Sequence, residues 1–222
     1  MSKTLNITLV GVGGQGTLLA SEILCQVALA SGRDVKKSEV HGMAQRGGSV
    51  VSQVRMGQKV HSPLIALGET DILIAFEKLE ALRYAHFLGP DGMAMVNDQE
   101  IRPVTVSSGQ AEWPEDLDGM LRSTFPKLEI IPALAMAREL GNVRAVNLVM
   151  IGALWNHMDV DESIWRDAIA ALVKPQFVKL TLKAFEAVRN SCSRALSRSP
   201  SPTALPRPNS VPDHFVPWSR GV

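Results

Sequence analysis

Residues 5–17 read LNITLVGVGGQGT, an apolar run that ends in a cluster of glycines. A continuous apolar run of this length is typical of a strand buried on both faces of a parallel sheet. Residues 17–31 follow with leucine, isoleucine and valine at helical spacing, and Gly32 stands where a helix C-cap glycine belongs. The stretch therefore predicts a strand, a tight glycine turn and a helix in direct succession.

Strand and helix patterns continue to alternate up to residue 189. Gly89-Pro90-Asp91-Gly92 has turn composition and is predicted to be a turn. The predicted strands are 35–40, 50–56 with a turn into 59–62, 71–76, 93–97 and 128–131, and the further helices are 77–88, 133–140, 143–158, 162–173 and 175–192. This order predicts an α/β fold, a Rossmann-like three-layer sandwich with a mainly parallel sheet and helices enriched in the C-terminal half.

The composition changes near residue 190. Residues 190–222 contain six of the thirteen prolines, seven serines and a single acidic residue, Asp213. Proline at this density removes backbone donors, and few aliphatic side chains remain to offset the entropy of ordering. We therefore expect one domain over residues 1–189 and a disordered tail over residues 190–222. As an alternative to a tail without a binding role, Phe215 and Trp218 could dock onto a partner protein.

The overall composition excludes several classes of protein. The chain has 222 residues, a formal net charge of +1 and two cysteines. A balanced charge argues against binding to nucleic acid or a membrane surface through a basic field. Two cysteines are too few for a disulfide scaffold or a self-contained iron–sulfur cluster. The sequence shows neither a transmembrane run nor a signal-peptide pattern, so we expect a cytoplasmic protein.

The glycines after the first strand form a G-x-G-x-x-G motif, Gly11, Gly13 and Gly16. Glycine there allows the N–H groups of a helix N-terminus to approach a phosphate. A dinucleotide site also needs an acidic residue at the end of the second strand, and Glu39 lies near that position, although farther from the glycines than usual. Three interpretations stay open: an anion or nucleotide site, an NAD site, or a turn that needs small residues for packing.

A second glycine-rich stretch, residues 41–48, follows the second strand and reads HGMAQRGG. Open α/β sheets bind ligands at this edge, and Arg46 offers a bidentate partner for a phosphate or carboxylate. For Arg46, the alternative is a salt bridge that anchors the loop. For His41, the alternative is a capping or packing role. We predict no catalytic residue and no metal ligand in the chain, and the candidate contacts to a cofactor are Gly11, Gly13, Gly14, Gln15, Gly16, Thr17, His41, Gln45, Arg46, Gly47 and Gly48.

Other polar residues have simpler interpretations. Glu77, Glu80 and Arg83 have the spacing of ordinary surface ion pairs on one helix. Asn147 and Gly152, within an apolar helix, indicate close packing. Asp91-Gly92 lacks the downstream asparagine pair of a thiamine diphosphate motif.

Several motifs in order resemble one known family. GVGGQG, EVHGMAQRGGSVVSQVR, SPLI, DILIAFEKLEALR and AVNLVMIGAL are similar to the gamma-type domain of 2-oxoacid:ferredoxin oxidoreductases. The form HGMAQRGG is most similar to the indolepyruvate branch, that is, its beta subunits. The resemblance spans residues 5–187, and its signature positions are the glycines and glutamine of residues 11–16 together with residues 46–48.

The resemblance implies the small subunit of a complex that oxidatively decarboxylates arylpyruvates, passing electrons to ferredoxin and the acyl group to coenzyme A. It implies that a large alpha subunit holds thiamine diphosphate, magnesium and iron–sulfur clusters, and that this chain alone binds no cofactor and is inactive. Three alternatives stay open: another 2-oxoacid specificity, a free-standing nucleotide-dependent oxidoreductase, and a nucleotide-binding regulator without enzymatic activity.

Overall fold

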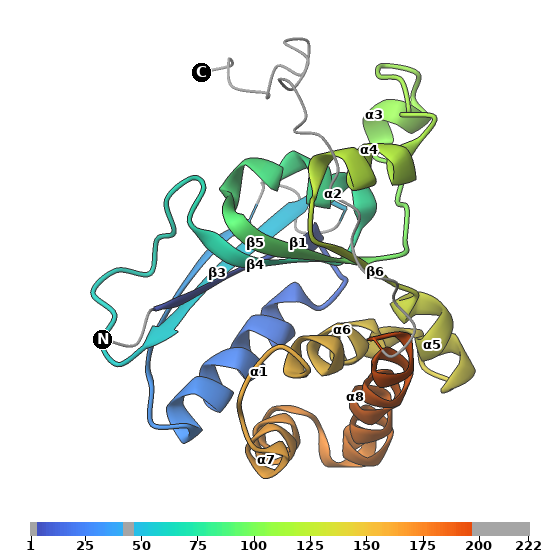
Figure 1. The fold of residues 1–222 in the computed structure, drawn as a ribbon. Coiled ribbons are helices and arrows are strands. Elements are labelled where there is room, and N and C mark those ends of the chain that lie inside the picture. The colour runs from blue at the N-terminus through green and yellow to red at the C-terminus, as the bar shows by residue number, and fades with distance from the viewer. Residues whose placement is uncertain (1–3, 42–46, 197–222) are drawn as a thin grey trace.

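The computed structural model describes residues 4–41 and 47–196 (Figure 1). Six strands form one sheet in the order β2-β3-β1-β4-β5-β6. The strands are β1 (Leu5–Val12), β2 (Asp34–His41), β3 (Ser49–Gly57), β4 (Thr70–Ala75), β5 (Leu88–Asn97) and β6 (Leu128–Ile131). Strand β1 pairs in parallel with β4, as do β4 with β5 and β5 with β6, whereas β3 is antiparallel to both β1 and β2. The prediction of a mainly parallel sheet is confirmed.

Helices cover both faces of the sheet, which confirms the three-layer sandwich. In Figure 1, α1, α5, α6, α7 and α8 lie below the sheet, and α2 and α4 lie above it. The helices and 3-10 turns are α1 (Thr17–Ala30), α2 (Lys78–Arg83), η1 (Ala85–Phe87), α3 (Val104–Ser107), α4 (Leu117–Thr124), α5 (Ala133–Glu139), η2 (Val143–Ala145), α6 (Val146–Trp155), α7 (Glu162–Leu172) and α8 (Pro175–Leu196).

The strands contribute alternate side chains to two apolar cores. Ile7 and Leu9 of β1 pack with α1 and the C-terminal helices, whereas Val10 packs on the opposite face with α2 and α4. Ile72 and Leu73 of β4 divide in the same way. Since successive side chains of a strand point to opposite faces, a continuous apolar run is what a strand covered on both sides requires.

Residues 89–92 form part of β5, so the predicted turn there is wrong. Glycine is required at position 92 because two strands approach each other closely there. A Cβ on Gly92 would lie 2.8 Å from the carbonyl oxygen of Thr70. Residues 59–62 form no strand, and α3 and α4 were not predicted.

Helix α8 extends through Leu196 and thus passes the expected domain boundary at residue 189. The rest of the expected tail, residues 197–222, lies outside the described residues. None of the helices within residues 4–41 and 47–196 has the length and apolar character needed to cross a membrane.

Candidate functional site

The first glycine loop connects β1 to α1 and lies at the carboxyl end of the parallel strands. Gly11 is paired within the sheet, and residues 13–16 turn the chain into the helix. Gly16 is the N-cap of α1 with φ +84°, and a Cβ on it would lie 2.7 Å from Nδ2 of Asn147. Both its left-handed backbone and its contact with α6 therefore require glycine.

Gln15 binds three parts of the site together. Its Oε1 accepts a hydrogen bond of 2.7 Å from the backbone N–H of Val12, and its Nε2 donates to the carbonyl of Phe76 and to Oε1 of Gln99 at 2.9 and 3.1 Å. Both amide hydrogens of Gln15 are thus used within the protein. In this structure Gln15 fixes the glycine loop to the ends of β4 and β5.

Two buried polar side chains flank the start of α1. Asn147 of α6, 3% exposed, donates to the carbonyl of Gly16 at 3.4 Å. Close packing, the interpretation of Asn147 and Gly152 from the sequence, is confirmed, because Gly152 lies directly against the backbone of Phe185. Thr17, the first residue of α1, has a buried Oγ1 without a hydrogen-bond partner among the described residues.

The second glycine stretch lies beside the first. The N–H of Gly13 donates to the carbonyl of Gly48 at 2.8 Å, and the N–H of Gly47 donates to the carbonyl of Gly13 at 3.4 Å. These bonds continue the pairing of β1 with β3. His41 ends β2, but its side chain lies outside the described residues, as do residues 42–46 with the candidates Gln45 and Arg46.

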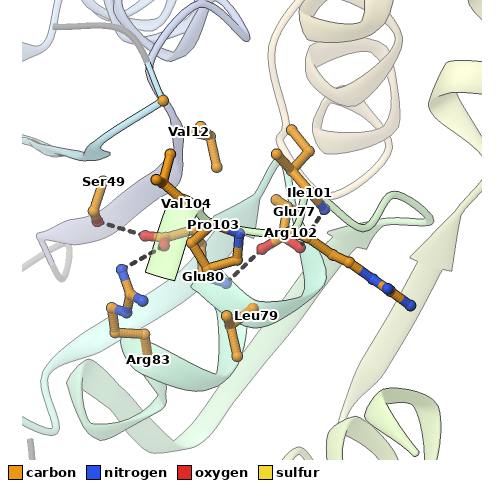
Figure 2. Close-up of a pocket in the computed structure, with 11 residues that line it drawn as sticks. Val12, Ser49, Glu77, Leu79, Glu80, Arg83, Ile101, Arg102, Pro103 and Val104 are labelled. Carbon is orange, nitrogen blue, oxygen red and sulfur yellow. Dashed lines mark hydrogen bonds and ion pairs between the residues drawn. The ribbon is translucent and has the colours of Figure 1, made fainter. Parts of the chain in front are cut away.

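A pocket of about 110 Å³ opens between the glycine loops, α2 and the segment after β5 (Figure 2). It lies where parallel strands end, the usual place of ligands in open α/β sheets. Its volume is well below the roughly 300–1,000 Å³ of small-molecule sites. The lining residues are Val12, Gly47, Ser49, Glu77, Leu79, Glu80, Arg83, Ile101, Arg102, Pro103 and Val104.

Two glutamates of this pocket are buried, which corrects their interpretation as surface residues. Glu77 is 1% exposed and Glu80 is 4% exposed. Glu77 is the N-cap of α2 and accepts hydrogen bonds from the N–H groups of Glu80 and Ile101 at 2.8 and 3.1 Å. Helical spacing reveals which residues share a face, but it does not reveal that residues 101–104 cover that face.

Burial raises the pKa of both glutamates above the ordinary value. At Glu77, hydrogen bonds from backbone N–H groups oppose the shift. At Glu80, the hydrogen bond from Ser49 and the positive charge of Arg83 oppose it. The pocket therefore has a wall of buried carboxylates whose charge is offset by partners within the chain.

Both arginines of the pocket have partners. Arg83 Nη1 lies 2.7 Å from Oε1 of Glu80. The guanidinium of Arg102 lies over the ring of Trp113, 5.7 Å from its centre, and Figure 2 shows this side chain pointing away from the pocket. Neither guanidinium is poised to bind an anion inside the pocket.

The geometry argues against the NAD interpretation. Strand β3 separates β2 from β1, so the end of β2 is not adjacent to the first glycine loop. Glu39 of β2 instead lies 2.8 Å from Nζ of Lys37 and 3.4 Å from Oγ of Ser21 in α1. Its carboxylate forms part of the contact between β2 and α1.

The described residues do not fit a metal centre or an iron–sulfur cluster. No group of three or more His, Cys, Asp or Glu side chains within them is arranged to hold a metal ion. Cys25 is buried, and burial raises the pKa of its thiol to about 11, which disfavours the thiolate that ligates iron. A larger open hollow of about 630 Å³ is lined by Glu112–Glu115 alone, four consecutive residues of one loop.

Comparisons with known proteins agree with one another. The family model described as pyruvate ferredoxin/flavodoxin oxidoreductase matches residues 6–191. The chain is 41% identical over 201 residues to indolepyruvate oxidoreductase subunit IorB of Archaeoglobus fulgidus, and the match covers 89% of this chain and 98% of that protein.

Two solved structures show the same fold. One is the gamma subunit of a keto/oxoacid ferredoxin oxidoreductase from Geobacter sulfurreducens, with a TM-score of 0.63, 21% identity, and coverage of 85% of this chain and 99% of that chain. The other is 2-oxoglutarate:ferredoxin oxidoreductase from Magnetococcus marinus with 2-oxoglutarate, coenzyme A and succinyl-CoA bound. Its TM-score is 0.65 at 20% identity, and the match covers 93% of this chain and 34% of that longer chain.

Proposed function

The chain belongs to the pyruvate ferredoxin/flavodoxin oxidoreductase family, and from this premise we propose that it is the small subunit of an indolepyruvate-type 2-oxoacid:ferredoxin oxidoreductase. The observation that supports this most directly is the 41% identity to an IorB subunit over nearly the whole of both chains. The resemblance seen in the sequence motifs is confirmed. The preference for arylpyruvates over other 2-oxo acids is part of the proposal.

The proposed complex divides its chemistry between two chains. Complexes of this family use thiamine diphosphate and iron–sulfur clusters, and this chain has two cysteines in total, too few for a cluster of its own. We therefore assign these groups, with magnesium, to a large alpha subunit. That subunit would decarboxylate the 2-oxo acid, pass electrons to ferredoxin and transfer the acyl group to coenzyme A. The present chain would be inactive alone.

The glycine loops of this chain would complete the binding site for an anionic group, which we take to be a phosphate of coenzyme A. The loops lie side by side, and the first N–H groups of α1 have no acceptor within the helix. At the same place, the buried hydroxyl of Thr17 has no hydrogen-bond partner within the part of the chain that the structure describes. A pocket of about 110 Å³ cannot enclose coenzyme A, so the ligand would lie across the interface with the large subunit.

Within this proposal, the ligand lies against some of the predicted residues. Gly13, Gly47 and Gly48 form the paired backbone that would lie beside the ligand, and Arg46 would supply the cation that the two arginines of the pocket do not. Gln15 would hold the loop in place rather than touch the ligand, since its amide hydrogens are already used.

Coexpression of the full chain with its large subunit tests the proposed function. We expect a complex with bound iron–sulfur clusters that reduces ferredoxin when indolepyruvate and coenzyme A are added. A complex that prefers pyruvate or 2-oxoglutarate would show another 2-oxoacid specificity. A chain that purifies without a partner and binds NAD in calorimetry would overturn the proposal in favour of a free-standing nucleotide-binding protein.

Replacement of Arg46 tests the anion site within the same complex. Arg46→Ala should raise the apparent KM for coenzyme A by roughly tenfold, the loss expected for one charge-assisted hydrogen bond. Arg122→Ala on α4 is the matched control and should leave the KM unchanged. Equal KM values for coenzyme A in the wild type and in Arg46→Ala would show that the glycine loops do not bind this ligand.

A cytoplasmic location stays a prediction, which cell fractionation would test.

A further inference from the structure

Strand β3 is fixed to helix α2 by one buried carboxylate (Figure 2). Oε2 of Glu80 accepts a hydrogen bond of 2.5 Å from Oγ of Ser49, the first residue of β3. Oε1 of the same carboxylate pairs with Nη1 of Arg83 at 2.7 Å. The hydroxyl of Tyr84 lies 3.2 Å from the serine hydroxyl. Glu80 thus joins the beginning of β3 to the end of α2.

The contact at Ser49 extends to both glycine loops. Ser49 follows Gly48 in the chain and lies opposite Val12 in the pairing of β3 with β1. Gly48 accepts the N–H of Gly13, and Gly47 donates back to the Gly13 carbonyl. A shift of Ser49 relative to α2 would therefore move the two loops together.

We infer that Glu80 is a positioning residue for the paired glycine loops. By holding Ser49, its carboxylate fixes Gly47 and Gly48 at one distance from α2 and so sets the width of the pocket between them. A hydrogen bond to an ionised carboxylate is shorter and stronger than one between neutral groups, which suits it to fixing a loop. Burial of the carboxylate is otherwise unfavourable, and the bonds to Ser49 and Arg83 offset that cost.

A purely structural role makes a different prediction. If Glu80 only stabilised the packing of α2 on the sheet, its loss would increase opening of all the strands that α2 and α4 cover, including β4 and β5. A positioning role predicts an effect confined to the glycine loops and the start of β3. Amide hydrogen exchange separates the two because it reports local opening residue by residue.

Hydrogen exchange of the full chain, in the assembly in which it purifies, is the primary test. In Glu80→Gln we expect the amides of Gly13 and Gly47 to exchange roughly tenfold faster, because the neutral amide accepts a weaker hydrogen bond from Ser49 and loses the ion pair with Arg83. Amides in β4 should keep their protection. Glu22→Gln is the matched control, because Glu22 forms an ion pair with Lys37 on the other side of the sheet.

Two variants of Ser49 sharpen this test. Ser49→Ala removes the hydroxyl and should reproduce the exchange pattern of Glu80→Gln, whereas Ser49→Thr keeps the hydroxyl and should restore protection. Unchanged exchange at Gly13 in both Glu80→Gln and Ser49→Ala would overturn the inference. An increase that spreads equally to β4 would overturn it as well, because it would show a purely structural role.

A second measurement connects the inference to catalysis and rests on the proposed function. In the complex, Glu80→Gln should raise the apparent KM for coenzyme A by roughly three- to tenfold and lower kcat by less. A wild-type complex that does not turn over arylpyruvates would defeat the proposed function, and the exchange measurement would still decide the role of Glu80. A lower kcat with an unchanged KM would contradict the inference that Glu80 positions the loops that bind coenzyme A.

Discussion

The two faces of the sheet are built from different chemistry. On the side of α1 and the C-terminal helices, one large apolar cluster includes fully buried side chains such as Trp165 and Phe185. On the side of α2 and α4 the apolar cluster is smaller, and beside it lie three charged residues, Glu77, Lys78 and Glu80, each no more than 5% exposed. The candidate pocket lies on this second side.

This difference indicates that one face of the sheet mainly stabilises the fold, whereas the other mainly positions the loops of the candidate site. Burial of apolar side chains is the dominant favourable term in folding, whereas a buried ion pair adds little net stability and is sensitive to the loss of either partner. The first face should therefore supply most of the free energy of folding. The charged residues of the second face should determine where the glycine loops and the segment after β5 lie.

The largest effect is expected from a substitution in the apolar face. Trp165→Ala should lower the free energy of unfolding by about 3–5 kcal/mol, because it removes a fully buried aromatic side chain and leaves a cavity. The ring of Trp165 lies 5.8 Å from that of Phe185 in α8, so this aromatic contact between α7 and α8 is lost with it. Urea unfolding monitored by circular dichroism measures the change.

Phe177→Ala in α8 is the control for this prediction. Its side chain is 42% exposed, so its removal should cost less than about 1 kcal/mol. Similar losses in the two variants would mean that the C-terminal helices do not stabilise the fold in the way proposed for this face.

A smaller effect is expected when a buried charge is removed from the second face. Nζ of Lys78 contacts Asp98 and Asp118 at 2.8 Å and Glu100 at 3.2 Å, which ties the segment after β5 to α4. Burial opposes the charged form of Lys78, but these carboxylates outweigh it and raise the lysine pKa. Lys78→Met should cost about 1–3 kcal/mol, less than for a fully buried pair because the carboxylates are half-exposed.

The first face offers a matched lysine. Lys37 of β2 contacts Glu22 and Glu39 at 2.6 and 2.8 Å, and its side chain is 26% exposed. Lys37→Met should cost about 0–1 kcal/mol, the usual value for an ion pair near the surface. If the two methionine variants unfold at the same urea concentration, the second face does not depend on its buried charge.

Much of the fold follows from local patterns in the sequence. The apolar run predicts β1, the glycines after it predict a turn, and the helical spacing that follows predicts α1. The structure contains these elements in this order. The glycines of β5 do not follow from such patterns. Gly92 sits against the backbone of Thr70, a contact between distant parts of the chain that favours glycine as strongly as a turn does.

The candidate site is less predictable than the fold. The glycines of both loops stand out in the sequence, and the structure brings the described ones together. The burial of Glu77 and Glu80 depends on the path of residues 101–103, which have no regular secondary structure, and on the first residue of α3, Val104. A short helix with the spacing of surface ion pairs therefore gives no sign that its charged face is covered.

The smallest effect expected from the difference between the faces concerns pH. Burial raises the pKa of Glu80 above its ordinary value of 4.5, against the hydrogen bond from Ser49 and the charge of Arg83. Between 4.5 and the higher folded value, the folded chain binds more protons at this site than the unfolded chain. The contribution of Glu80 to stability therefore falls as pH rises through that range.

Glu80→Gln removes this titration, so the stability of the variant minus that of the wild type should increase as pH rises from 4.5 and then level off. Asp34→Asn is a control of opposite sign, because a hydrogen bond from the N–H of Val60 lowers the pKa of Asp34 below its ordinary value of 3.8. The contribution of Asp34 is lost as pH falls through its folded pKa, so the Asp34→Asn difference should decrease as pH rises towards 3.8 and then level off. Urea unfolding at a series of pH values measures both differences. A pH-independent difference for Glu80→Gln would mean that burial does not strain the carboxylate, and that the second face tolerates its charges as easily as the surface does.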